Sequence, residues 1–405
     1  MQYENFLSKK VQEIKPSGIR KFFDLASEME GVISLGVGEP DFDTPWHIRE
    51  AAIYSIESGK THYTANQGLL ELREEICAYQ KRRFHLDYDP VHNVIITVGG
   101  SEGIDIAMRA IVNPGDEVIL MEPSYVAYTP SVQLTGAIPV HVKLEHEEQF
   151  KLTPEKLEAA ITPKTKAILL NFPSNPTGGV MTKEDYAKLV PIIKKHELIV
   201  ISDEIYAELS YEDNFYSLAN FDEIKDQVII ISGFSKAYAM TGWRLGYVLA
   251  NQTFTEAMNK IHQYIIMSAP TGAQYGAIDA MRNGDIHVQE MKEAYMSRRN
   301  FITKGFNRIG LPTHLPQGAF YIFPDIRSTG LTSDEFCEQL LNEQKVACVP
   351  GTAFGDAGEG FIRVSYAYSI EHIKEAIERI DAFMEISLKR KAFPHRNALL
   401  SLWQH

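Results

Sequence analysis

The chain has little cysteine: Cys77, Cys337 and Cys348 are the only three among 405 residues, and no two of them form a Cys-x-x-Cys pair. Three widely separated cysteines support neither a disulfide framework nor a cysteine zinc site. This usage is typical of proteins kept in a reducing compartment, so we predict a cytoplasmic location.

Long hydrophobic runs are also missing. The longest, such as residues 167–170 and 228–231, are far shorter than the roughly 18 apolar residues that a membrane span needs. Residues 1–10 lack the apolar stretch of a signal peptide. The sequence therefore predicts neither membrane insertion nor export.

Excess positive charge is absent as well. The chain has 40 Lys and Arg against 53 Asp and Glu, a net charge of −13, which argues against a general nucleic-acid binder. No repeat of 20 to 50 residues occurs. The apolar fraction of 44% is ordinary for a globular protein, and the length allows two domains.

Several common catalytic and nucleotide-binding motifs are missing. There is no GxxxxGK[ST], and residues 36–40 (GVGEP) break the spacing of GxGxxG. The His-Glu pairs at 146–147 and 196–197 lack the second histidine of HExxH, and no serine lies in GxSxG. Kinase, nicotinamide-dependent, metalloprotease and α/β-hydrolase functions are therefore not supported.

The sequence does contain short runs of β-branched and apolar residues that alternate with helical patterns. Continuous apolar strands between helices indicate a mainly parallel sheet covered on both faces, an α/β fold. We predict a large domain at residues 46–284 and a smaller α+β domain formed by both chain ends, 1–45 and 285–405. The expected strands are 94–98, 117–121, 167–170, 198–202, 228–232 and 246–250, with short strands near 318–323 and 362–365, and the expected helices include 69–83, 104–112, 288–308 and 370–385.

The most informative segment is residues 232–246, SGFSKAYAMTGWRLG, which follows an apolar strand directly. A lysine at this place, Lys236, is partly desolvated, which favours the neutral amine and makes it a candidate Schiff-base nucleophile. A lone lysine is more often a surface charge. The neighbouring Ser235 and Arg244 favour the functional interpretation, because lysine and guanidinium could bind opposite ends of one phosphorylated ligand.

A second candidate is the start of a helix at Gly99-Gly100-Ser101-Glu102-Gly103. Exposed N–H groups and the helix dipole make such a turn an anion site, and the glycines allow a phosphate to approach. Glycine-rich turns between strand and helix are also common for geometric reasons alone.

Polar and aromatic side chains follow three other expected strands. Asp203 could hold a protonated heterocyclic nitrogen or simply cap a helix, and Tyr206 could donate to a phenolate oxygen. Asn175 lies in an Asn-Pro pair that makes a turn, with a cis peptide as one option, and Tyr125 could stack on a flat cofactor. Arg363, inside a short apolar strand, could bind a carboxylate or form a structural salt bridge.

With these motifs the chain resembles the class I and II aminotransferases, pyridoxal 5'-phosphate enzymes of fold type I, over residues 1–386. The segments SKxxxMTGxRxG, NPTG and SDEIY and the arginine at 363 occur in the family's order. The resemblance implies that Lys236 forms a Schiff base with the cofactor, that Asp203 pairs with its pyridine nitrogen, and that Tyr125 stacks on its ring. Asn175 and Tyr206 would bond its phenolic oxygen. The phosphate would be held by backbone groups of Gly100, Ser101 and Glu102, by Ser235 and by Arg244.

The resemblance also implies a homodimer and a substrate class. Tyr63 matches a tyrosine that reaches the neighbouring subunit's phosphate, so the active sites would be shared. Gly38 matches the loop over the substrate, and Arg363 the residue that binds its α-carboxylate. The aspartate-specific members carry a lysine at Ser101 and a Ser-Ala-Thr where this chain has Ile19. The substrates would then be a 2-oxo acid and a less polar amino acid, such as alanine or an aromatic one.

Two rival functions remain open at this stage. One is a carbon–sulfur β-lyase on the same scaffold. The other is a regulator that binds the cofactor without turnover, as in fusions to a helix-turn-helix module, which the absence of such a module before residue 11 disfavours. An aminotransferase using 2-oxoglutarate or pyruvate as acceptor is the preferred interpretation.

Overall fold

The computed structural model describes residues 3–14, 16, 18, 29–213 and 215–392. The chain divides into two compact units. The first comprises Met1–Lys15, Glu39–Ala294 and Gln317–Ala319, and the second comprises Pro16–Gly38, Tyr295–Pro316 and Phe320–His405. This division assigns residues 1–15, 39–45, 285–294 and 317–319 to the larger unit, whereas the boundaries expected from the sequence assign them to the smaller domain.

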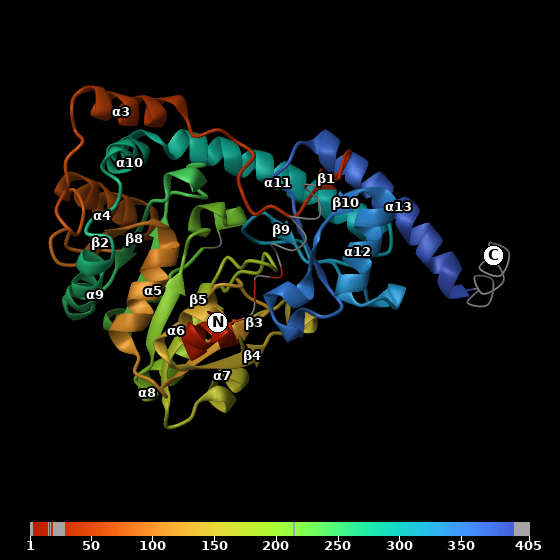
Figure 1. The fold of residues 1–405 in the computed structure, drawn as a ribbon, viewed down its shortest axis with the longest axis horizontal. Helices are drawn as coiled ribbons and strands as arrows, with labels where there is room; N and C mark the ends of the chain where they lie inside the picture. Colours follow the sequence, from red (N-terminus) through yellow and green to blue (C-terminus); the bar gives the residue numbers. More distant parts are fainter. Residues whose placement is uncertain (1–2, 15, 17, 19–28, 214, 393–405) are drawn as a thin grey trace. The chain divides into compact units, whose positions relative to one another are not determined.

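A seven-stranded sheet forms the centre of the first unit as far as it is described (Figure 1), with the strand order β2-β8-β7-β6-β5-β3-β4. Strand β8 is antiparallel to both of its neighbours, and the strands from β7 to β4 run parallel to one another. The strands are β2 (Val94–Thr97), β3 (Glu117–Glu122), β4 (Ile138–Lys143), β5 (Thr165–Asn171), β6 (Ile199–Asp203), β7 (Val228–Gly233) and β8 (Gly246–Leu249).

Helices surround this sheet, and a buried apolar core lies between the sheet and helices α5, α6 and α9. The α/β fold predicted from the sequence is therefore confirmed. The helices that lie wholly in the first unit are α1 (Lys9–Glu13), α3 (Trp46–Glu57), α4 (Leu70–Phe84), α5 (Gly99–Ile111), α6 (Tyr128–Thr135), α7 (Pro154–Ala160), α8 (Lys183–Lys195), α9 (Gln252–Ile265) and α10 (Thr271–Asn283).

Burial explains which strands the sequence reveals. Every residue of β7 is buried, so both faces of that strand are apolar and the run is conspicuous. Strand β4 was not predicted, because it lies at the sheet edge, most of its residues are at least partly exposed, and its sequence contains Pro139. Proline is tolerated at an edge because the missing N–H need not bond to another strand.

The described residues of the second unit form two small sheets. Strands β1 (Ile33–Ser34) and β10 (Val346–Ala347) pair in parallel, and β12 (Ile362–Ser365) pairs antiparallel with β9 (Tyr321–Ile322) and with β11 (Val349–Pro350). The short strands expected near 318–323 and 362–365 are thus confirmed. The remaining helices are α11 (Asp285–Arg308), α12 (Ser333–Gln344) and α13 (Ile370–Ala392).

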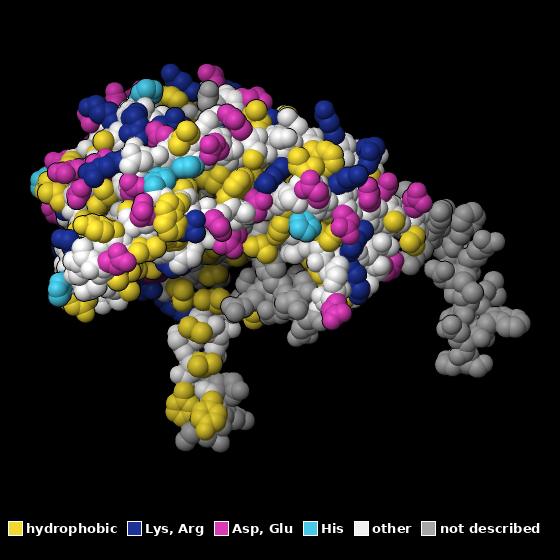
Figure 2. Space-filling model, turned by 90° about the horizontal axis from the view of Figure 1, so that it is seen from above, with side chains coloured by type: hydrophobic (Ala, Val, Ile, Leu, Met, Phe, Trp, Pro, Cys, Tyr) yellow, Lys and Arg dark blue, Asp and Glu magenta, His cyan; other side chains and the backbone are white. Residues whose placement is uncertain are grey.

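The surface and the cysteines agree with the sequence analysis. Lys, Arg, Asp and Glu side chains are interspersed on the face in Figure 2. Across the described residues, no helix is both long enough and apolar enough to span a membrane. All three cysteines are buried free thiols. The cytoplasmic location stays a prediction.

Candidate active site

The carboxyl ends of parallel strands bring the predicted residues to one edge of the sheet. Asp203 ends β6, where it pairs in register with Asn171 of β5 on one side and with Ile231 of β7 on the other. The loops that leave these strands carry Asn175 and Lys236. In open α/β sheets this edge is where ligands bind.

Asp203 is a buried carboxylate that bonds to neutral donors. Its Oδ2 accepts from the Tyr128 hydroxyl at 2.7 Å, and its Oδ1 accepts from the backbone N–H of Ile205 at 3.1 Å. Burial raises the pKa of Asp203 to about 6, and these two hydrogen bonds together with the nearby Lys236 charge partly oppose that increase. The carboxylate is therefore well suited to a cation or a protonated nitrogen brought by a ligand.

Two tyrosines connect Asp203 to the strand β3. Tyr128, at the start of α6, stands edge to face with Tyr125, with 5.5 Å between the ring centroids. The ring of Tyr125, a predicted cofactor-binding residue, is thus held near the carboxylate through Tyr128. Tyr128 was not predicted as a site residue, because its partner Asp203 lies 75 residues away along the chain.

Asn175 is positioned by a second asparagine. The side-chain oxygen of Asn171 accepts from the Asn175 backbone N–H at 3.0 Å, and its amide nitrogen donates to the carbonyl of Asp203 at 3.1 Å. Both asparagines are buried, and the Asn175–Pro176 peptide is cis. Asn171 therefore joins the loop after β5 to the end of β6. This positioning role was not predicted from the sequence.

Lys236 follows β7 in a loop of buried residues. Its side chain is half-buried, and its Nζ lies 5.8 Å from the centroid of the Tyr206 ring. Tyr206 and Ser235 are both buried. An amine and a phenol are therefore close together at the edge where Asp203 ends its strand.

The start of α5 forms a cradle beside Arg244. Gly99 has a φ of 70°, in the left-handed region that favours glycine, and a Cβ there would lie 2.7 Å from Nη2 of Arg244. The guanidinium also donates to the carbonyl of Thr241 at 3.1 Å. Gly100 is half-buried and Ser101 is exposed in the first turn, where backbone N–H groups have no partner within the helix. A guanidinium and a helix N-terminus thus meet in one place.

Comparison with known proteins decides the family. The family model for aminotransferase class I and II matches residues 30–380. The chain is 55% identical over 380 residues to a putative aminotransferase of Bacillus subtilis (strain 168), YugH, with 94% of this chain and 98% of that protein covered. The chain belongs to the class I and II aminotransferases.

Other relatives of this aminotransferase have different named substrates. An aspartate aminotransferase of Pyrococcus abyssi (strain GE5 / Orsay) is 44% identical over 378 residues, with 93% of this chain and 97% of that protein covered. The crystal structure of an aromatic aminotransferase from Pyrococcus horikoshii OT3 has a TM-score of 0.87 at 42% identity, with 92% and 99% covered. The enzyme therefore has the fold type I architecture of its family.

Enzymes of this family depend on pyridoxal 5'-phosphate, and the residues of the first unit fit that group. A buried carboxylate suits its ring nitrogen, and a half-buried amine suits its aldehyde. The glycine turn at the start of α5, next to Arg244, suits its phosphate. The predicted cofactor is thus confirmed at the level of the family.

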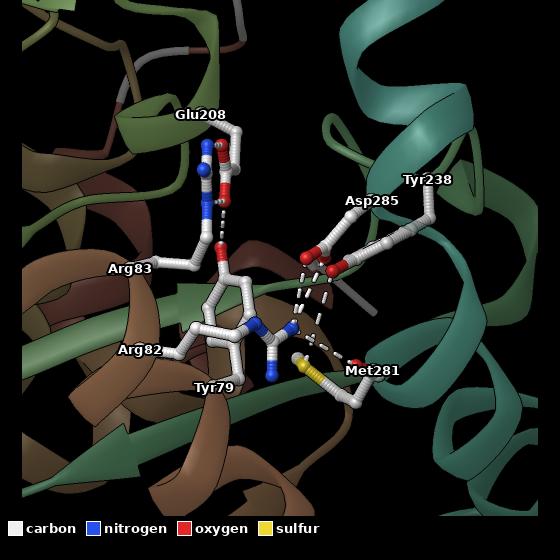
Figure 3. Close-up of polar contacts among 7 residues, drawn as sticks. All are labelled: Tyr79, Arg82, Arg83, Glu208, Tyr238, Met281 and Asp285. Carbon is white, nitrogen blue, oxygen red and sulfur yellow. Dashed lines mark hydrogen bonds and ion pairs between the residues drawn. The ribbon is translucent and has the colours of Figure 1, made fainter.

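Figure 3 shows contacts of Tyr238, two residues after Lys236, and of Glu208, two residues after Tyr206. The Tyr238 hydroxyl lies 3.9 Å from the sulfur of Met281, and Arg82 donates to the carbonyl of Met281 and to the carboxylate of Asp285. In the same view Glu208 accepts 2.6 Å and 2.7 Å bonds from the Tyr79 hydroxyl and Nη2 of Arg83. These contacts attach the segments after Tyr206 and Lys236 to helices α4 and α10.

A third buried carboxylate, Glu204, lies next to Asp203. The hydroxyls of Ser202 and Ser217 donate to its Oε1 at 2.9 and 2.6 Å. Burial raises the pKa of Glu204 to about 7, which the two hydroxyls partly oppose. This side chain can therefore stay protonated at a pH where an exposed glutamate is ionised.

Two other predicted residues, Arg363 and Gly38, belong to the second unit. In the second unit Arg363 is buried, with its guanidinium 4.6 Å from the Tyr321 ring and 4.8 Å from the Phe354 ring, and it donates to the carbonyl of Gly36. Gly38 has no room for a side chain, because a Cβ would clash with the Tyr321 hydroxyl. Tyr63 of the first unit is exposed. Ile19 lies outside the described residues.

Proposed function

We propose that this aminotransferase moves the amino group of an L-amino acid of low polarity to a 2-oxo acid in two half-reactions. The observation that carries the proposal is the presence of the half-buried amine of Lys236 and the buried carboxylate of Asp203 at one sheet edge, with the Tyr206 ring beside the amine. The acceptor we propose is 2-oxoglutarate or pyruvate.

Different residues of the first unit would bind different groups of the cofactor. Asp203 would bind the ring nitrogen in its protonated form, and Tyr125 would lie against the ring. Asn175 and Tyr206 would bind the phenolic oxygen. The phosphate would be bound by Gly100, Ser101 and Glu102 through backbone N–H groups, and by Ser235 and Arg244.

The cofactor, when bound, supplies the carbonyl that takes up the amino group and the ring that disperses negative charge. Lys236 has the chemistry of a general base and acid: as a neutral amine it removes the proton from the substrate's α-carbon and later returns a proton. Arg363 would bind the α-carboxylate of the substrate. Gly38 would lie in the loop that covers the substrate.

The substrate preference rests on two positions. Aspartate-specific members carry a lysine where this chain has Ser101, and a Ser-Ala-Thr where it has Ile19. Both features help to bind a side-chain carboxylate, so their absence favours alanine or an aromatic amino acid as donor. Relatives of similar identity are named for aspartate and for aromatic substrates, and they do not separate these choices.

We also propose a homodimer with shared active sites. Tyr63 is 81% exposed, and in the proposal it binds the phosphate in the second subunit. Further apolar side chains of the first unit, among them Tyr54 and Tyr264, are exposed as well. Light scattering would test the assembly, and a single-chain molar mass at micromolar concentration would contradict it.

The assignment is tested by the Lys236→Ala variant. We expect turnover to fall by at least about a thousandfold, because the base that moves the proton is lost. Wild-type enzyme should show a visible cofactor absorption band that bleaches when an amino acid is added without any 2-oxo acid. Lys195→Ala, which removes an exposed lysine, is the matched control and should change neither readout. Near-normal turnover by Lys236→Ala would overturn the proposal.

The same bleaching assay ranks the donors. We expect alanine or an aromatic amino acid to bleach the band at lower concentration than aspartate does. The opposite order would contradict the proposed preference. Release of ammonia and pyruvate from cystathionine without a 2-oxo acid would instead indicate a carbon–sulfur β-lyase.

A further inference from the structure

A buried histidine lies beneath the start of helix α5. His262, near the end of α9, has no exposed surface, and its Nδ1 lies 2.6 Å from Oε1 of Glu102. Its Nε2 lies 2.8 Å from the carbonyl of Asn66. The other carboxylate oxygen of Glu102 accepts from the backbone N–H of Val98 at 2.5 Å. Both ring nitrogens and both carboxylate oxygens are therefore in use.

These contacts fix how many protons the pair of His262 and Glu102 holds. A carbonyl oxygen only accepts, so Nε2 of His262 carries a proton. The short contact between Nδ1 and Oε1 needs a second proton, whichever atom holds it. Imidazolium with carboxylate and imidazole with carboxylic acid have the same total charge, so the pair is neutral in either arrangement. His262 is the source of that neutrality.

The neutrality of the pair matters for anion binding because Glu102 lies at the start of α5. Its carboxylate reaches Val98, which precedes the first turn of α5, where the helix dipole and free N–H groups attract an anion. A negatively charged carboxylate there would cancel the positive potential at the start of α5 and repel a phosphate. Arg244 provides one positive charge beside Gly99, and a bare Glu102 would cancel it.

We propose that His262 is a positioning residue for cofactor binding, which neutralises Glu102 so that the start of α5 accepts a phosphate dianion. The inference rests on the proposed phosphate site. His262 acts through Glu102 and is not in contact with the phosphate in this arrangement.

The same histidine holds the segment that follows Tyr63. Besides the bond from His262 to the Asn66 carbonyl, the Asn66 amide donates to the carbonyl of Met267 at 2.8 Å. Gln274 also holds the segment, since its side chain bonds to Thr64 and to the Leu69 backbone. His262 thus links the chain's own phosphate turn to the segment that would present Tyr63 to a second subunit.

The test compares two ligands that differ only in the phosphate. The full-length chain, freed of cofactor, is titrated with pyridoxal 5'-phosphate and with pyridoxal. His262→Gln keeps a side chain that can hydrogen-bond but cannot neutralise Glu102. We expect about tenfold weaker binding of pyridoxal 5'-phosphate and unchanged binding of pyridoxal. The double variant with Glu102→Gln should bring phosphate-dependent affinity back to within about threefold of wild type.

Three results of these titrations would contradict the charge role of His262 or the proposed phosphate site. Equal weakening for both ligands, or a double variant as weak as His262→Gln, would overturn the charge role. If wild type binds the two ligands equally well, the proposed phosphate site itself fails. His196→Gln, which alters an exposed His–Glu158 pair, is the control and should change neither affinity.

A second variant covers the case in which His262→Gln does not fold. Glu102→Gln removes the anion, leaves His262 in place and keeps the backbone N–H group of residue 102 that the proposed phosphate site uses. The proposal expects it to bind pyridoxal 5'-phosphate at least as tightly as wild type. Binding about tenfold weaker than wild type would overturn the proposal.

Discussion

Two buried carboxylates, Asp203 and Glu208, have different partners. Asp203 ends strand β6 at the sheet edge, and Glu208 follows it five residues later. Glu208 accepts two bonds from the guanidinium of Arg83 and one from the Tyr79 hydroxyl (Figure 3). The bonds to Glu208 raise the pKa of Arg83 above its usual value. Asp203 instead accepts from a phenol and an amide, and its pKa rises to about 6 because it is buried.

The difference separates a structural carboxylate from a functional one. The charge of Glu208 is balanced within the protein, so that site needs no ligand and serves to join segments. The hydrogen bonds of Asp203 orient its carboxylate without supplying a full charge. Only the nearby Lys236 charge offsets the burial of this carboxylate, so it is less fully balanced than Glu208 and suits a positively charged group of a ligand.

The largest expected effect is on catalysis. Asp203→Asn keeps the shape, can still accept from the Ile205 N–H and can donate to the Tyr128 hydroxyl oxygen, but it carries no negative charge. We expect kcat/KM for the best donor to fall about a thousandfold with little change in the unfolding temperature. Asp87→Asn, at an exposed ion pair with Lys81, is the control. Activity within tenfold of wild type would mean that the two carboxylates do not differ as described.

The second effect is on stability. Glu208→Ala removes the partner of Arg83 and leaves the buried Tyr79 hydroxyl without its acceptor. Because the Arg83 side chain is 40% exposed and can be hydrated, we expect a loss of about 2–3 kcal/mol, less than for a fully buried pair. Glu208→Gln, which can still accept from Tyr79, should lose less. Urea unfolding measures both, and equal losses would contradict the role of the hydroxyl.

The smallest effect concerns Glu204, which is neither paired with a cation nor proposed to meet a ligand. Its folded pKa of about 7 lies above the ordinary 4.5, so the native state holds a proton that the unfolded chain has released. The stability it contributes is complete below pH 4.5 and is lost as the pH rises through 7. Glu204→Gln stays neutral and can accept from Ser202 and Ser217.

The expected result is a change in the pH dependence of unfolding. From pH 5 to pH 8, Glu204→Gln should gain about 2 kcal/mol relative to wild type, measured by urea unfolding of the cofactor-free chain. Parallel curves for the two proteins would show that Glu204 is already ionised at pH 5.

The central strands were predictable because their burial on both faces makes their sequences continuously apolar. Strand β7 is an example, and the residues after it, ending in Lys236, follow the expected order. The edge strand β4 was missed because exposure and Pro139 remove that signal. The continuously apolar strands also revealed the candidate residues, because these residues directly follow the strands.

The supporting contacts could not be predicted from the sequence. Tyr128 is 75 residues from Asp203, Arg83 is 125 from Glu208, and His262 is 160 from Glu102. No local pattern encodes such distances, because each pair meets only after the helices have packed on the sheet. A tyrosine, an arginine or a histidine in a helix has the same local signature whether or not a carboxylate lies opposite it.

The sequence by itself determined the α/β fold, the family and the residues that follow each strand, because apolar periodicity and strand-end motifs are local along the chain. Only the tertiary structure decided which carboxylate is balanced by a cation, which is held by neutral donors and which is neutralised by a histidine. Those outcomes depend on burial and on partners distant in sequence, and these set the electrostatic energy of each charge.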